Sequence, residues 1–411
     1  MIGSTASRPP FPVTLDNWQT AAQIGWTFCH IAEIFPTAVI SRGSRPAARL
    51  QRRIEPVGEL PCQDAHGNRS TVGEVMAATN TDGWMVVHDD EILAEEYAGE
   101  MGPAALHLLM SVSKSIVGML VGALVHESEL NVEEPVTAYV PELAQSGYRG
   151  ATVRHLLDMR SGIAFSEDYL DPDAEVRVLE QAMGWAPRRS PHVPTTLRGF
   201  LLTLRQGRPH GGSFDYRSCE TDILGWVCEA AARQRFPELA SALVWSRLGV
   251  DFDANIAVDS EGTGMFDGSI SAAMCDLARF GVMIARQGTS LSNHQVVPET
   301  WIADSFAGGH DSRQAFASSS NDTYMPGGMY RNQFWFPWPD RQVLLCLGIH
   351  GQMVYVDRET GLVAVKLSSW PTPQDPWRLF STLAAFNAIK AEMAPHRAEP
   401  SLWGDPVSRL T

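Results

Sequence analysis

Residues 107–126, HLLMSVSKSIVGMLVGALVH, decide the fold of this 411-residue chain. Small and aliphatic side chains occur nearly all the way round a helix built from residues 111–126, which predicts a buried central helix. Lys114 stands near the start of this otherwise almost uncharged segment. Because burying an ammonium group is costly, we expect Lys114 to have a chemical role.

Ser111 and Lys114 form an SxxK pair at the start of that helix. Side chains three positions apart lie on one face of a helix, so the hydroxyl and the ammonium can meet. A serine needs a base to become a nucleophile, and a lysine can be that base when desolvation and the helix N-terminus favour its neutral form. Of the three lysines in the chain, only Lys114 has a serine three residues before it. The alternative is that Lys114 reaches solvent from the helix end.

Two further motifs supply candidate partners for the nucleophile. Tyr216 follows a glycine-rich turn, and a phenol beside a lysine can pass protons between nucleophile and leaving group. The alternatives are a buried aromatic for Tyr216 and a helix N-cap for Ser218. Residues 348–352, GIHGQ, end a β-rich segment, where a backbone N–H group can face an oxyanion. His350 within this motif is more typical of an ordinary core or edge histidine than of a catalytic one.

β-Rich segments occur toward both ends of the chain. Residues 82–98 predict a hairpin, in which WMVVH turns at DDE into ILAEEY. Residues 343–349 and 361–367 are expected to pair with each other across a turn at 357–361. These two regions predict one sheet built from both ends of the chain.

The middle of the chain has mostly helical patterns, with short helices expected at 151–159 and 221–233. A cleft between a helical lobe and a sheet-containing lobe is the usual place for an active site. The predicted division is a leader at residues 1–20, an α/β lobe at 21–110 and 251–411, and a helical lobe at 111–250 that carries the nucleophile helix and the Tyr216 loop.

Composition excludes several classes of function. The formal charge of −15 disfavours nucleic acid as a partner, because phosphate binding needs a basic surface. The longest apolar stretch, residues 116–125, is too short to span a bilayer, and the first residues lack the pattern of a secretory signal. The six cysteines contain no CxxC spacing, which is typical of reduced thiols. We therefore expect a cytoplasmic protein, without a membrane partner, that acts on a small molecule.

With these residues identified, the chain resembles the 6-aminohexanoate-dimer hydrolases, a branch of the serine β-lactamase-like, penicillin-recognising hydrolases. The resemblance implies an α/β fold in which an antiparallel sheet flanked by helices is formed from both termini, with an inserted all-helical lobe. It also implies a homodimer. The likeness runs nearly the whole length and rests on LDNWQ (15–19), HLLMSVSKS (107–115), VTAYVPELA (136–144), EDYLDP (167–172), GIHGQ (348–352) and VKLSSWP (365–371).

The resemblance implies catalytic roles residue by residue. Ser111 matches the nucleophile of the family and Lys114 its general base. Tyr216 matches the tyrosine that assists proton transfer to the leaving amine. The backbone N–H groups of Ser111 and Ile349 match the oxyanion hole. No metal or organic cofactor is needed for this chemistry.

A substrate pocket is implied as well. Tyr169 matches a tyrosine that contacts the scissile amide in the closed form. Glu180 stands about where amide-hydrolysing members carry an aspartate that binds the free amino group of the substrate. Phe334 and Trp335 stand where the family tends to have two tryptophans, so we expect a different pocket wall. The implied substrate-binding residues are Tyr169, Glu180, Trp185, Ser218, Phe334, Trp335 and His350.

These residues predict a serine hydrolase that works through an acyl-enzyme on short-chain carboxylic esters, with the amide of 6-aminohexanoate linear dimer as a further candidate. Residues 349–351 replace the strand lysine of true β-lactamases, so efficient penicillin recognition is not expected. A β-lactamase or D-amino-acid peptidase is the alternative within enzymes. A non-catalytic ligand-binding protein of the same fold is the alternative outside them, and it would have no need of Ser111, Lys114 and Tyr216 together.

Overall fold

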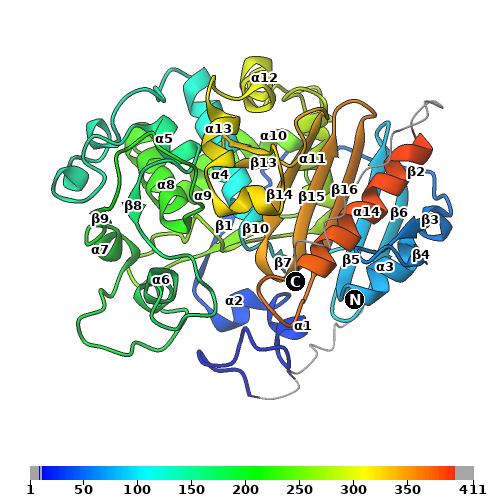
Figure 1. The fold of residues 1–411 in the computed structure, drawn as a ribbon, viewed down its shortest axis with the longest axis horizontal. Coiled ribbons are helices and arrows are strands. Elements are labelled where there is room, and N and C mark those ends of the chain that lie inside the picture. The colour runs from blue at the N-terminus through cyan, green and yellow to red at the C-terminus, as the bar shows by residue number, and fades with distance from the viewer. Residues whose placement is uncertain (1–8, 10–11, 394–411) are drawn as a thin grey trace.

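An eight-stranded sheet, in the order β12-β13-β14-β15-β16-β5-β6-β2, forms the centre of the computed structural model, which describes residue 9 and residues 12–393 (Figure 1). Neighbouring strands are antiparallel except β2 and β6, which run parallel at one edge. The predicted antiparallel sheet is therefore confirmed apart from that edge. The strands are β2 (Gln51–Arg52), β5 (Thr81–His88), β6 (Glu91–Tyr97), β12 (Met329–Arg331), β13 (Phe334–Phe336), β14 (Val343–Gly348), β15 (Gln352–Asp357) and β16 (Leu362–Ser368).

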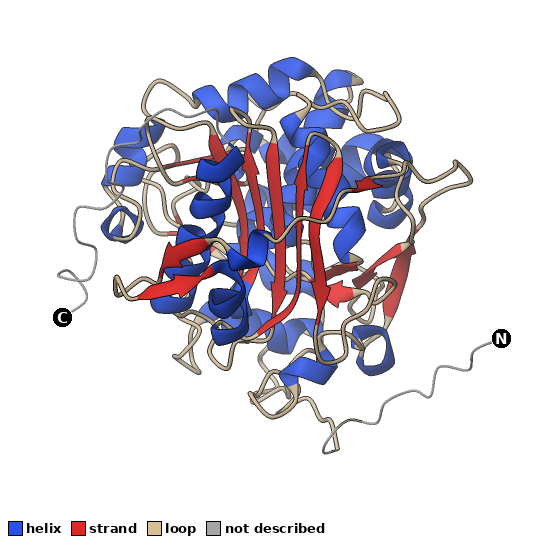
Figure 2. Ribbon diagram, turned by 90° about the vertical axis from the view of Figure 1, so that its right-hand side faces the viewer, coloured by secondary structure: helices blue, strands red, loops and turns tan. Residues whose placement is uncertain are grey.

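Helices cover both faces of this sheet, as Figure 2 shows. On β15, Met353 and Tyr355 belong to the apolar cluster that contains α14 (Pro376–Met393) and α3 (Val72–Ala78), whereas Val354 belongs to the cluster that contains α11 (Met274–Ala285). Because both faces are buried, the central strands are continuous apolar runs without alternation of apolar and polar residues.

The pairing of the C-terminal strands differs from the sequence prediction. β14 and β16 were expected to be neighbours, but β15 lies between them and pairs with both. Gln352, the first residue of β15, belongs to the GIHGQ motif, and the apolar run that follows it was not predicted to be a strand. The hairpin predicted at residues 82–98 is confirmed by the pairing of β5 with β6.

A second sheet, in the order β1-β10-β11-β7, leads the chain into the central helix. Its last strand ends three residues before Ser111, and Leu109 then donates its N–H to the carbonyl oxygen of Ile270 on β11. The strands of this sheet are β1 (Thr37–Ile40), β7 (His107–Leu108), β10 (Ala254–Ala257) and β11 (Ile270–Ala272), and a separate pair is formed by β3 (Pro61–Gln63) and β4 (Arg69–Thr71).

Most of the middle of the chain is helical and lies at the left of Figure 1. The expectation that it is entirely helical is wrong, because β8 (Ile163–Ala164) pairs with β9 (Arg205–Gln206). The remaining helices are α1 (Ile24–Thr27), α2 (Ile31–Ile34), α4 (Val112–His126), α5 (Val153–Leu157), α6 (Glu175–Met183), α7 (Leu197–Leu201), α8 (Ser218–Ala232), α9 (Phe236–Ala240), α10 (Ser246–Leu248), α12 (Glu299–Ala307) and α13 (Ser312–Ala317). Among the described residues, no helix has the length and apolar character that a membrane crossing requires.

The central helix α4 is buried along nearly its whole length, as predicted. Gly118 allows the turn between β12 and β13 to approach it closely: a Cβ atom at this position would lie 2.4 Å from the carbonyl oxygen of Asn332. Ser115 donates a 2.9 Å hydrogen bond to the carbonyl oxygen of Gln333 in the same turn. The edge hairpin of the large sheet is thus fixed against the helix that carries Ser111.

The predicted leader at residues 1–20 lies partly outside the described residues, which omit 1–8 and 10–11. Among residues 12–20, Trp18 anchors the segment to the body of the protein, whereas most of its neighbours are exposed. Trp18 is only 1% exposed, and its ring N–H donates to the carbonyl oxygen of Trp185 at 2.9 Å.

Candidate active site

Ser111 is the N-cap of α4 and follows a residue in an unusual conformation. Met110 has a φ of 46°, in the left-handed region that side chains other than glycine rarely adopt. This backbone geometry turns the chain sharply from β7 into the helix. Ser111 itself is 8% exposed, so its hydroxyl lies at the edge of the core. Strained backbone of this kind is frequent at functional sites.

The ammonium group of Lys114 is held entirely by protein atoms. Its Nζ donates to Ser111 Oγ at 3.0 Å, to Ser218 Oγ at 3.0 Å and to the backbone oxygen of Asp267 at 2.8 Å. The residue is 1% exposed. The alternative in which Lys114 reaches solvent is therefore excluded. The predicted contact between Ser111 and Lys114 is confirmed.

Burial and charge act on Lys114 in opposite directions. Burial lowers its pKa, but the negative potential of Tyr216, Asp267 and Glu167 outweighs that effect and raises the pKa above its ordinary value. Lys114 is therefore an ammonium at neutral pH in this arrangement. The prediction that desolvation favours the neutral amine is wrong, because acidic groups from other parts of the chain reverse the balance.

Tyr216 lies two residues before α8, with its ring 5.2 Å from Lys114 Nζ. Burial raises the pKa of its phenol above the ordinary value, and the opposing effects of the Lys114 charge and of hydrogen bonding to Ser111 and Lys114 only partly offset this rise. The ring stacks on Trp335 with 5.3 Å between centroids and 27° between planes. A phenol in this place can exchange protons with both partners.

Glu167 connects the site to the loop that carries Tyr169. Its carboxylate accepts the backbone N–H of Ser218 at 2.9 Å, the Ser218 hydroxyl at 2.5 Å and the Tyr169 hydroxyl at 2.6 Å. Ser218 is the first residue of α8 and not its N-cap, so it bridges Lys114 to this carboxylate. Tyr169 was predicted from the EDYLDP string, and Glu167, which belongs to the same string, was not.

Asp267 and Asp222 form a second acidic group behind Lys114. Asp267 Oδ2 lies 3.3 Å from Lys114 Nζ, and the backbone N–H of Asp267 donates to Asp222 Oδ1 at 3.1 Å. Burial and the charge of Asp267 raise the pKa of Asp222 well above its ordinary value. No local motif distinguishes these aspartates in the sequence, because they approach Lys114 only through the fold.

The end of β14 lies against the residues that precede the nucleophile. A Cβ atom on Gly348 would be 2.6 Å from the carbonyl oxygen of Leu109, so only glycine allows this approach. Ile349 follows directly, and His350 then takes a left-handed φ of 61°. Gly348 thus lies against the residues that lead into α4, and the oxyanion hole expected from the N–H groups of Ser111 and Ile349 stays a prediction.

His350 is buried and neutral. It is 2% exposed, its Nδ1–H donates to the carbonyl oxygen of Trp370 at 2.8 Å, and burial lowers its pKa to about 4. A neutral ring that uses Nδ1–H as a donor leaves Nε2 as an acceptor. His350 is therefore a wall of the cavity described below and not an acid at neutral pH.

The hairpin of β12 and β13 supports Tyr216 from behind. Trp335 faces the site, but Phe334 is fully buried in the core on the other side of the strand, so the expectation that Phe334 contacts substrate is wrong. Successive side chains of a strand point to opposite faces, and only one of an adjacent pair can face a pocket.

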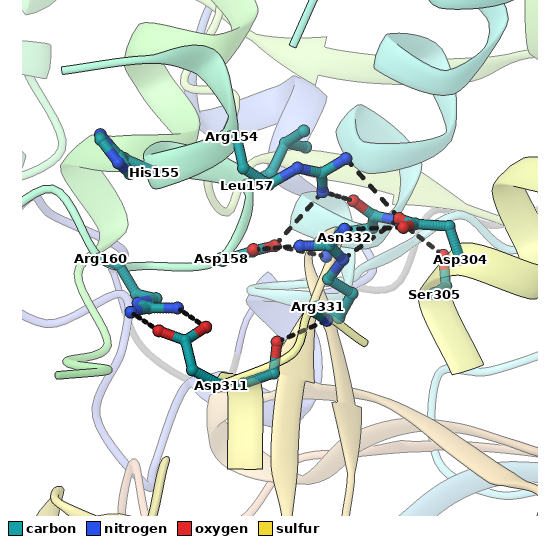
Figure 3. Close-up of polar contacts among 12 residues, drawn as sticks. Arg154, His155, Leu157, Asp158, Arg160, Asp304, Ser305, Asp311, Arg331 and Asn332 are labelled. Atoms are coloured by element: carbon teal, nitrogen blue, oxygen red, sulfur yellow. Dashed lines mark hydrogen bonds and ion pairs between the residues drawn. The ribbon is translucent and has the colours of Figure 1, made fainter. Parts of the chain in front are cut away.

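Ion pairs and hydrogen bonds fix the turn of this hairpin, as Figure 3 shows. Arg331 donates to Asp158 Oδ2 at 2.6 Å and to Asp304 Oδ1 at 2.7 Å. Asn332 donates to Asp304 Oδ2 at 2.8 Å and to the Ser305 hydroxyl at 2.9 Å. The network ties the hairpin to α12 and to the end of α5.

A cavity of about 300 Å³ adjoins the site and contains Tyr169, Glu180, Trp185 and His350 in its lining, although Ser111 does not line it. Trp185 stacks on Phe35 with 5.3 Å between ring centroids, which makes it a rigid wall. Glu180 does not present a free carboxylate. Its two oxygens accept hydrogen bonds from Arg177 Nη1 at 2.7 and 2.8 Å.

One group of potential metal ligands occurs among the described residues, formed by Asp251, Cys275 and Asp276. Arg279 already pairs with Asp251 at 2.6 Å and with Asp276 at 2.8 Å. Backbone N–H groups of Asp251 and Phe252 also donate to Asp276. The group is therefore a structural ion-pair cluster, because an arginine stands where a cation would bind.

Comparison with known proteins finds similar hydrolases in both sequence and structure. The profile of the beta-lactamase family matches residues 68–385. The 6-aminohexanoate-dimer hydrolase of Paenarthrobacter ureafaciens is 40% identical over 372 residues, which are 90% of this chain and 91% of that protein. Esterase EstB of Burkholderia gladioli is 30% identical over 232 residues, 53% of this chain and 54% of the esterase. A solved Bacillus anthracis structure with the provisional name 6-aminohexanoate-dimer hydrolase matches 95% of this chain and 100% of its own, with a TM-score of 0.85 and 22% identity.

Proposed function

This chain belongs to the beta-lactamase family of serine hydrolases, and we propose that it cleaves short-chain carboxylic esters through an acyl-enzyme on Ser111. The observation that carries this proposal is the position of Lys114 Nζ, 3.0 Å from Ser111 Oγ and 3.0 Å from Ser218 Oγ. A nucleophile and a buried amine are in direct contact there, and the ring of Tyr216 lies 5.2 Å from the amine. Such a set is what acyl transfer by an activated serine requires.

Acylation begins when Ser111 Oγ attacks the ester carbonyl carbon. The hydroxyl proton passes to the Lys114–Tyr216 pair in its deprotonated form, which is the minor form at neutral pH because the pKa values of both groups are raised. The carbonyl oxygen becomes an oxyanion facing the N–H groups of Ser111 and Ile349. The tetrahedral intermediate then collapses, and the same proton goes to the departing alkoxide. The alcohol leaves, and the acyl group stays on Ser111.

Deacylation reverses these roles. A water molecule gives its proton to the Lys114–Tyr216 pair and attacks the acyl carbon. Collapse of the second intermediate returns the proton to Ser111 Oγ and releases the carboxylic acid. Glu167 and Asp267 lie near Lys114 and raise its pKa, so they stabilise the ammonium form that holds the proton between the two steps.

The test is hydrolysis of p-nitrophenyl acetate and butyrate by the protein and by its Ser111→Ala variant. Ester cleavage that depends on Ser111, with a burst of p-nitrophenol equal to one turnover, supports the proposal. Cleavage that persists in Ser111→Ala contradicts it. Nitrocefin in parallel separates the alternative: faster turnover of nitrocefin than of esters would make the protein a β-lactamase.

A second candidate is hydrolysis of the amide in 6-aminohexanoate linear dimer. The 40% identity to the Paenarthrobacter ureafaciens hydrolase favours it. The Arg177–Glu180 ion pair counts against it, since the carboxylate expected to hold the amino group already has a cation. Release of 6-aminohexanoate from the linear dimer would show that the amide is cleaved, and no release would contradict this second candidate.

We also propose that the protein is a homodimer in solution. Light scattering coupled to size-exclusion chromatography tests this proposal.

A further inference from the structure

Arg177 and Glu180 face each other one turn apart on α6, at the wall of the cavity beside the site. Both Glu180 oxygens accept hydrogen bonds from Arg177 Nη1, at 2.7 and 2.8 Å, and one also accepts the Gln19 side-chain amide at 3.1 Å. The Arg177 and Glu180 side chains are 20% and 11% exposed. An ion pair this sheltered is screened less by water and salt than a surface pair.

The rest of the Arg177 guanidinium is also occupied. Its Nε and Nη2 donate to the backbone oxygen of Tyr169 at 3.1 and 2.6 Å. Each of its three nitrogens therefore has an acceptor. The arginine is preorganised on Glu180 by the loop that carries Tyr169, so it stays there without help from a substrate.

The charges that line the cavity cancel. Asp16 and Glu180 contribute two negative charges, Arg177 and Arg189 contribute two positive charges, and His350 is neutral at its lowered pKa of about 4. The net formal charge of −15 for the whole chain therefore does not extend to this pocket.

We propose that Arg177 is a specificity-determining residue that occupies Glu180 in place of a substrate's amino group, so that the cavity selects acyl chains without a terminal ammonium. This inference rests on the proposed esterase function and names its substrate class. An ammonium-bearing chain must either displace Arg177 from Glu180 or bring a second cation next to it, and both are unfavourable. A neutral chain of equal length pays neither cost.

The experiment compares two esters with one leaving group. p-Nitrophenyl 6-aminohexanoate carries an ammonium where p-nitrophenyl heptanoate carries a methyl group, so the ratio of their kcat/KM values reports on the terminal charge alone. The variants are Arg177→Gln, Arg177→Lys and Arg177→Gln/Glu180→Gln. Arg189→Gln is the matched control, because Arg189 lines the same cavity but bonds to the backbone of Pro172 and not to Glu180.

We expect the unsubstituted protein to favour the heptanoate, and Arg177→Gln to raise the aminohexanoate-to-heptanoate ratio about tenfold, as one sheltered charge pair would. Arg177→Lys, which keeps the positive charge but loses the planar guanidinium, should raise this ratio less. Adding Glu180→Gln should return the ratio to its starting value, and Arg189→Gln should change it less than twofold.

Three results would overturn the inference: a ratio unmoved by Arg177→Gln while heptanoate is still cleaved, an equal rise in Arg189→Gln, or loss of both activities in both single variants at position 177. Loss of both activities would mean that Arg177 positions the Tyr169 loop and does not discriminate between substrates. Failure of the unsubstituted protein to cleave either ester is a different outcome, because it would contradict the proposed function itself.

Discussion

Lys114 Nζ lies 2.8 Å from the backbone oxygen of Asp267 and 3.3 Å from Oδ2 of the same residue. The two residues are 153 positions apart in the chain. One residue thus supplies both a neutral acceptor and a negative charge to the same ammonium. The protonation state of the candidate base is set by this long-range contact as much as by the helix on which it lies.

Replacing Asp267 with Asn should shift the pH dependence of ester hydrolysis toward lower pH. The variant keeps the backbone acceptor and removes one of the charges that, with those of Tyr216 and Glu167, raise the pKa of Lys114. Because the deprotonated pair accepts the proton of Ser111, kcat/KM should rise with pH, and its rising limb should move down by about one pH unit. A pH profile of p-nitrophenyl butyrate hydrolysis measures the shift.

Asp222→Asn is the control for this prediction. Burial and the charge of Asp267 raise the pKa of Asp222 well above its ordinary value, which favours the neutral carboxyl group, and an amide is the neutral replacement closest to it in shape. Its pH profile should therefore move less than that of Asp267→Asn. A larger shift of the pH profile in Asp222→Asn than in Asp267→Asn would mean that Asp222, and not Asp267, carries the negative charge.

Tyr216→Phe should lower kcat for ester hydrolysis about 100-fold, the size of a typical proton-transfer contribution. The phenyl ring still stacks on Trp335, whose centroid lies 5.3 Å away, so thermal stability should change little. Steady-state kinetics and calorimetry on one preparation separate the two effects. An unchanged kcat would remove Tyr216 from the mechanism.

Contacts within one helical turn could be read from the sequence. The spacing of Ser111 and Lys114 fixes their meeting once α4 forms, and the uncharged character of that helix predicts its burial. The confirmed β5–β6 hairpin is local in the same sense, since both strands and their turn are contiguous.

Contacts that depend on tertiary packing could not be predicted from the sequence in this way. Glu167 and Asp267 reach Lys114 from other elements, and nothing in their own neighbourhoods marks them. The direction of Phe334 depends on which face of β13 meets the core, and a three-residue strand gives no usable periodicity. Glu180 was recognised by position, but its pairing with Arg177 follows from side-chain geometry.

Arg331→Met should destabilise the protein by about 3 kcal/mol, because it leaves the carboxylate of Asp158 buried without its principal cation. Asp158 is 3% exposed and accepts Arg331 Nη1 at 2.6 Å. Chemical denaturation measures the free energy of unfolding. The double variant Arg331→Met/Asp158→Asn should recover part of the loss, and equal losses in both variants would show that packing and not charge is responsible.

Lys366→Met should stabilise the protein, most strongly at or below pH 7. Lys366 is fully buried, with Thr79 and Ser368 as acceptors, and burial lowers its pKa to about 7. The unfolded chain has a lysine pKa of about 10.4. Below pH 7 both the folded and the unfolded states are protonated, so folding must bury the charge. Between about pH 7 and 10.4 the folded state binds fewer protons than the unfolded state, so its stability rises with pH and the advantage of methionine shrinks.

Lys390→Met is the matched control. Lys390 is 4% exposed but pairs with the buried Asp357 at 3.1 Å, so its removal should destabilise the protein. Thermal melts of the three proteins at pH 6 and pH 9 test both signs, and a stabilisation by Lys366→Met that grows with pH would contradict the argument.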